Sequence, residues 1–84
     1  MLWRYSQSAT IDFSTHAVDQ LKIRLNITRP MVRQTLIRPN KILGTFRERQ
    51  LFRKRYGDKI LEVVAVKEDN TIIVVTQYFL GQES

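Results

Sequence analysis

The only histidine of the sequence lies where a helix is expected to begin. His16 follows Ser14 and Thr15, whose side chains are common helix caps. On the helix predicted over residues 15–25, it falls roughly 160° from the middle of the apolar stripe, so it is not placed as an ordinary core residue. We interpret His16 either as an exposed or capping histidine, or as a substrate contact that acts as a general acid or base.

Positive charge is concentrated in the middle of the chain. Of the fourteen Lys and Arg residues, eleven lie between Lys22 and Arg55, where Glu48 is the only acidic residue. This stretch carries +10 against +6 for the whole chain, so the remainder is net −4. Nine basic residues are arginine, whose planar fork of donors suits phosphate. The pattern favours RNA or DNA binding, and the alternatives are an acidic protein partner or a solvated basic surface.

Six arginines are predicted to contact nucleic acid. They are Arg29 and Arg33 on a predicted helix, and Arg47, Arg49, Arg53 and Arg55 around a predicted strand. The last four share parity, so a single uninterrupted strand would place them on one face. A turn around residues 47–50 would break that arrangement. Arginines that share a sheet face need solvent or an anion, so this group is the strongest candidate for a phosphate surface.

Two polar residues of the last predicted strand are further candidates. Thr76 and Tyr78 share one face of the strand predicted over residues 71–79. A tyrosine hydroxyl at a strand end can donate to a phosphoryl oxygen or serve as a weak acid, and the alternative is a sheet tyrosine with a solvated tip. The sequence has no cysteine, one histidine and no metal-ligand spacing, and it therefore predicts neither a metal site nor a cofactor.

These residues must be positioned by a small fold. The 84 residues are 43% hydrophobic and 26% charged, which predicts one globular domain over residues 1–84, with residues 1–8 as a loose arm or edge strand. The predicted helices span residues 15–25 and 29–38, and the predicted strands residues 9–13, 42–46, 49–55, 60–66 and 71–79. We expect an α+β fold in which two N-terminal helices pack on a three- to four-stranded antiparallel meander sheet, to which the N-terminal strand can add.

Short motifs at both ends resemble a known family. The run Ser14-Thr15-His16-Ala17-Val18, followed by Arg24 and by Ile27-Thr28, resembles the opening of the domain of unknown function 4258 family. The segment Thr76-Gln77-Tyr78 resembles the "T-x-Y" end of that family's last strand. The resemblance covers residues 12–80. Two positions depart from the pattern, because Gln20 stands in place of an arginine and Asn26 in place of a glycine.

The resemblance implies a RelE-like fold, shared with microbial ribonucleases, and a role similar to that of small RelE- and BrnT-type toxins. It implies metal-independent RNA cleavage, RNA as the substrate and an acidic antitoxin or other acidic protein as a partner. The catalytic candidates are then His16, Arg24, Thr76 and Tyr78, with His16 as acid or base and Arg24 at the phosphate.

Two other functions remain open at this point. The first is a non-catalytic module that binds nucleic acid or an acidic protein through its arginines. The second is an interaction domain whose basic stretch is only solvated. No apolar run approaches the ~20 residues that span a bilayer, and the N-terminus lacks a signal-peptide pattern, so we expect a cytoplasmic location.

Overall fold

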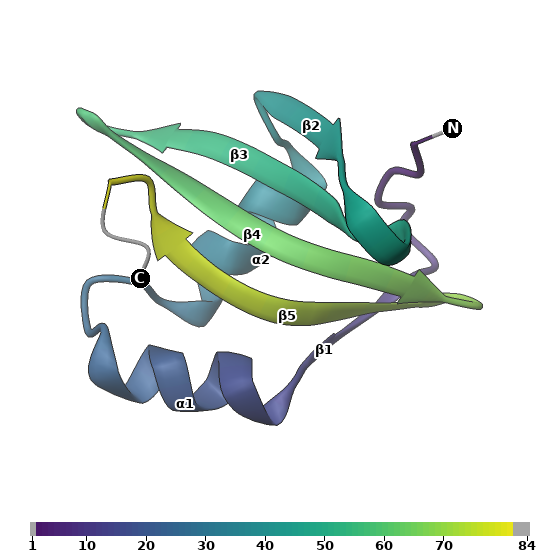
Figure 1. Ribbon diagram of the computed structural model, residues 1–84, viewed down its shortest axis with the longest axis horizontal. Helices are drawn as coiled ribbons and strands as arrows, with labels where there is room; N and C mark the ends of the chain where they lie inside the picture. The colour runs from purple at the N-terminus through teal and green to yellow at the C-terminus, as the bar shows by residue number, and fades with distance from the viewer. Residues whose placement is uncertain (1, 82–84) are drawn as a thin grey trace.

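Two α-helices and five strands make up most of the computed structural model, which describes residues 2–81 (Figure 1). In chain order they are β1 (Thr10–Phe13), α1 (Thr15–Ile23), α2 (Arg29–Ile37), β2 (Lys41–Gly44), β3 (Gln50–Tyr56), β4 (Lys59–Glu68) and β5 (Thr71–Phe79), with a short 3₁₀ turn η1 (Phe46–Glu48) before β3. The α+β class is confirmed, and both helices end slightly earlier than predicted.

The strands form one mixed sheet in the order β1-β5-β4-β3-β2. Strands β2 to β5 are an antiparallel meander, as expected. However, β1 pairs in parallel with β5, from Thr10 opposite Thr71 to Phe13 opposite Val74. The N-terminal strand thus adds to a four-stranded meander, but in parallel, so the expected antiparallel sheet is corrected to a mixed sheet of five strands. The reason is topological, because both helices follow β1 and carry the chain across the sheet before the meander begins.

Both helices begin at hydroxyl caps, the first of them at Ser14, one of the two cap candidates in the sequence. Ser14 Oγ accepts the Ala17 N–H at 3.1 Å and donates to the Val75 carbonyl at 3.0 Å, so it fixes the start of α1 onto β5. Thr28 Oγ1 accepts the Met31 N–H at 3.3 Å and caps α2 in the same way.

The helices cover only one face of the sheet. Ala17 of α1 and Val32 and Leu36 of α2 join a core made with inward side chains of the strands, which include Phe52, Leu61, Val63, Ala65, Ile72 and Val74. Figure 1 shows α2 behind β3 and β4, and α1 along β5 and β1, in agreement with their contacts. We call the opposite side the open face. It carries the alternate strand residues, among them Arg53, Glu62 and Tyr78.

The N-terminal segment, expected as a loose arm or an edge strand, is attached to the sheet through Trp3. The Trp3 N–H donates to Gln50 Oε1 at 2.7 Å, and Gln50 Nε2 donates to the Trp3 carbonyl at 2.8 Å. The Gln50 side chain is buried, and its amide group satisfies both the N–H and the carbonyl of Trp3, as the backbone of a paired strand would. The Trp3 ring lies 5.1 Å from that of Phe52, which extends the core beneath the arm.

Candidate nucleic-acid interface

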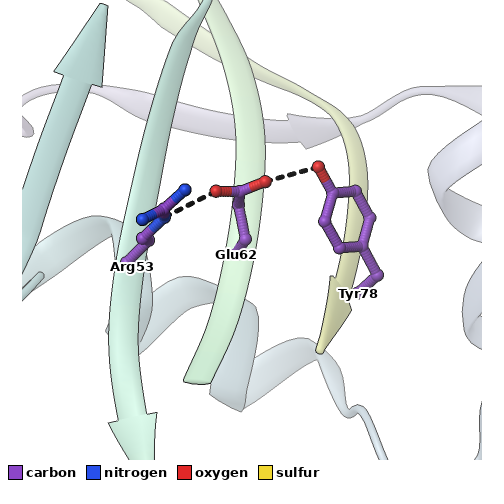
Figure 2. Close-up of polar contacts among 3 residues, drawn as sticks. All are labelled: Arg53, Glu62 and Tyr78. Atoms are coloured by element: carbon purple, nitrogen blue, oxygen red, sulfur yellow. Dashed lines mark hydrogen bonds and ion pairs between the residues drawn. The ribbon is translucent and has the colours of Figure 1, made fainter. Parts of the chain in front are cut away.

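Three side chains from three adjacent strands are linked at the centre of the open face. Register places Arg53 of β3 opposite Glu62 of β4, and Glu62 opposite Tyr78 of β5. Arg53 Nε donates to Glu62 Oε1 at 2.7 Å, and the Tyr78 hydroxyl donates to Glu62 Oε2 at 2.5 Å (Figure 2). Glu62 is only 4% exposed on a face without helices. Both carboxylate oxygens therefore have a partner that compensates for burial of the charge.

A cationic depression adjoins this triad where β2 begins and β3 turns into β4. It has a volume of about 810 Å³, and its lining residues are Asn40, Lys41, Arg53, Lys54, Arg55, Gly57 and Ile60. Four of these seven residues are lysine or arginine, and none is acidic. Such a surface attracts an anion, and arginine offers donors to the separate oxygens of a phosphate.

Local backbone geometry holds the depression in place. The Asn40 N–H donates to the Arg53 carbonyl, and Asn40 Oδ1 accepts the Arg55 N–H, both at 2.8 Å. Asn40 thereby pairs with the Arg53 carbonyl and the Arg55 N–H of β3, just before the first residue of β2. Gly57 takes a φ of +65° in the turn after β3, a conformation that glycine adopts without strain. Its carbonyl accepts Arg55 Nε at 3.2 Å, which fixes that guanidinium.

The structure divides the six arginines predicted to bind nucleic acid. Arg53 and Arg55 share the open face of β3 and the cationic depression. Arg47 and Arg49 do not continue that face, because Arg47 and Glu48 adopt positive φ values of 57° and 63° and interrupt the strand. The single uninterrupted strand considered for the four arginines is therefore not formed, and the turn raised as the alternative leaves only Arg53 and Arg55 on a common strand face.

The two remaining arginines lie in the helical layer. Arg29 and Arg33 are exposed on α2, and the Arg29 guanidinium lies 4.8 Å from the centroid of the Phe13 ring. Because α2 packs on the face opposite Arg53, neither belongs to the cationic depression.

The four catalytic candidates do not form one site. Gln77 Nε2 donates to the Ala17 carbonyl at 2.9 Å, so Gln77 points toward α1. Its strand neighbours Thr76 and Tyr78 point to the open face, where they lie opposite Val64 and Glu62. His16, the exposed second residue of α1, and Arg24, its C-cap, belong to the helical layer. The sheet thus separates His16 and Arg24 from Thr76 and Tyr78.

Sequence reasoning missed Glu62, Lys41 and Lys54 as parts of the site. A signal for Glu62 existed, because it interrupts an apolar strand and a carboxylate there needs a partner. Identifying that partner requires the register of β3 and β5 against β4. Lys41 and Lys54 are ordinary surface lysines in the sequence, and only the start of β2 beside β3 brings them to the same depression.

Comparison of the chain with protein-family models, curated proteins and solved structures gives no match. Across residues 2–81, no helix has the length and apolar character required to cross a membrane. In the same residues, no group of three or more His, Cys, Asp or Glu side chains is arranged to hold a metal ion. The chemistry of the open face and its cationic depression is therefore the basis for the function inferred below.

Proposed function

We propose that this protein is a module that binds single-stranded RNA through the cationic depression and the adjoining open face. The observation that carries the proposal is that Lys41, Arg53 and Arg55 of the open face line one depression together with Lys54 from the other face of β3, and that none of its lining residues is acidic. Phosphate neutralisation supplies most of the affinity in non-specific nucleic-acid binding.

The open face supports this proposal by its composition. Leu51 and Tyr78, both half-buried, flank the Arg53–Glu62 pair on neighbouring strands, and the buried Val64 lies next to them. Single-stranded RNA can place unstacked bases on such a sheet surface, whereas the bases of a duplex are already paired. Apolar and aromatic side chains beside a phosphate site therefore suit a single strand better than a duplex.

RNA affinity is expected to fall steeply with salt. If the site neutralises three to four phosphate charges, log K should decrease against log salt with a slope of about −2 to −3, because a single strand contributes about 0.7 per charge. The substitutions Lys41→Ala and Arg55→Ala together should weaken binding by about tenfold and flatten the slope by about 1.4, because two contacts of about 0.7 each are lost. Fluorescence anisotropy of a labelled oligouridine over a series of salt concentrations measures both quantities.

A matched double variant tests whether location or only net charge matters. Arg4→Ala with Lys22→Ala removes the same two charges from exposed residues outside the depression. Equal weakening by both double variants would show diffuse attraction and contradict the proposed site. Salt-insensitive binding of a protein partner, without RNA affinity, would instead favour an interaction domain whose basic stretch is only solvated.

The Arg53–Glu62–Tyr78 triad supports a second candidate function, a RelE-like metal-independent endoribonuclease with an acidic antitoxin. Glu62 would accept the proton of the 2′-hydroxyl as its oxygen attacks the adjacent phosphorus, and Arg53 would stabilise the phosphoryl charge. The bond from phosphorus to the 5′-oxygen would break, and Tyr78 would protonate that oxygen and then recover a proton from Glu62. Because both oxygens of Glu62 are engaged, Arg53 must move to the phosphate to free Oε1.

Cleavage of labelled RNA in EDTA tests this second candidate. Glu62→Gln, which can keep neutral hydrogen bonds, should reduce cleavage by about 10²–10⁴. Cleavage that instead depends on His16, measured with His16→Ala, would place the reaction in the helical layer. If the purified wild-type protein binds RNA without cleaving it, the endoribonuclease candidate is contradicted and the RNA-binding function is retained.

A further inference from the structure

The positive charge of the open face is confined to one end. The open-face residues of β2 and β3 include Lys41, Arg53 and Arg55. In contrast, the open-face residues of β4 and β5 are acidic, apolar or neutral; they are Ile60, Glu62, Val64, Val66, Glu68, Thr71, Ile73, Thr76 and Tyr78. An RNA strand that lies across the open face would therefore contact cations only over β2 and β3, and none over β4 and β5.

Three of the four cations that line the depression donate hydrogen bonds within the protein. Arg53 Nε is bonded to Glu62, Arg55 Nε to the Gly57 carbonyl, and Lys54 Nζ to the Arg38 carbonyl at 3.0 Å. Each arginine uses only its Nε in this bond, so its terminal amino groups hold the remaining donors. Side chains fixed in this way lose little further conformational freedom when an anion binds.

The local charge exceeds what one internal phosphate requires. Glu62 offsets Arg53, and Lys54 points to the other face of β3, where its Nζ donates to the Arg38 carbonyl, so Lys41 and Arg55 remain as net positive charges on the open-face side of the depression. An internal phosphodiester carries one negative charge, whereas a terminal phosphate carries about −1.5 to −2 at neutral pH. A dianion therefore complements this cluster better than a diester does.

From the confined charge and the fixed cations, we propose that the depression recognises the phosphorylated end of an RNA strand. The terminal phosphate occupies the cationic depression, and the adjoining nucleosides lie over the apolar part of the open face beyond Arg53. This inference rests on the proposed RNA-binding function and narrows it to a phosphomonoester end. The 5′-to-3′ direction of the RNA across the open face then depends on which of its ends carries that phosphate.

Binding of one oligouridine in three forms tests the inference: with a 5′-phosphate, with a 3′-phosphate, and with hydroxyl groups at both ends. We expect one phosphorylated form to bind the full chain at least about tenfold more tightly than the hydroxyl form. The preferred form identifies the recognised end. Because a phosphomonoester loses its second charge near pH 6, the preference should shrink as the pH falls below that value.

Variants and outcomes separate this inference from the proposed function. Lys41→Ala with Arg55→Ala should abolish the preference for the phosphorylated form, whereas Arg4→Ala with Lys22→Ala should retain it. Equal affinity for all three forms would overturn end recognition and leave RNA binding intact. Absence of binding to every form would overturn the proposed function as well.

Discussion

Replacing Arg53 by alanine is expected to lower the free energy of unfolding by about 3 kcal/mol. Removal of one partner of a buried ion pair typically costs about 3–5 kcal/mol, because the remaining charge stays in a poorly solvated site. The lower end applies here because the Arg53 side chain is 30% exposed, although Glu62 is nearly buried. Urea denaturation followed by circular dichroism measures the change.

Two comparison variants distinguish the cost of leaving the Glu62 charge unpaired from a general loss of packing. Arg53→Met combined with Glu62→Leu removes both charges and should remain within about 1 kcal/mol of the wild type, since apolar replacement of a buried pair is often neutral. Arg33→Ala, at an exposed position of α2, should change stability by less than about 0.5 kcal/mol. If Arg53→Ala were as mild as Arg33→Ala, solvent would have to reach Glu62 and screen it.

Replacing Phe52 by alanine should have the largest effect on stability, about 4 kcal/mol. Phe52 is fully buried in the centre of the core and also supports the Trp3 ring of the N-terminal arm. Truncation of a buried phenylalanine removes its transfer free energy and leaves a cavity, at a cost of about 3–5 kcal/mol. Since small domains have about 5–15 kcal/mol in total, this variant should be close to unfolding.

Trp3 is the only tryptophan of the chain, so its fluorescence reports on this contact. We expect Phe52→Ala to shift the emission of Trp3 toward that of a solvated indole under native conditions. Phe52→Leu keeps most of the apolar volume and should cost less than about 2 kcal/mol. A loss below about 1 kcal/mol in Phe52→Ala would mean that the side chain contributes little to the core.

Elements set by local chemistry could be predicted from the sequence. Ser14 and Thr28 mark the helix starts because their hydroxyls satisfy nearby N–H groups. Gly57 marks the turn after β3 because it tolerates a positive φ. The interruption at Arg47 and Glu48 could be raised only as an alternative, since neither residue type favours the left-handed conformation that both adopt.

Features that depend on pairing between distant segments could not be predicted. Arg53 and Tyr78 were both candidates, but on separate grounds, and only the strand register shows that Glu62 joins them. In the same way, His16 and Tyr78 belong to short sequence motifs, and such motifs do not show that the two residues lie on opposite sides of the sheet. The parallel pairing of β1 with β5 also has no local signal, because it joins the first strand to the last.

That pairing has a consequence for how the chain matures during synthesis. Among the five strands described, β1 is synthesised before the others, and its hydrogen-bonding partner β5 is synthesised after them. Until then β1 has no neighbour in the sheet, and α1, which is capped onto β5 by Ser14, lacks the surface on which it docks. Contacts between such distant segments slow folding. Assembly should therefore begin with the β2–β4 meander and finish when β5 admits the N-terminal strand and helix together.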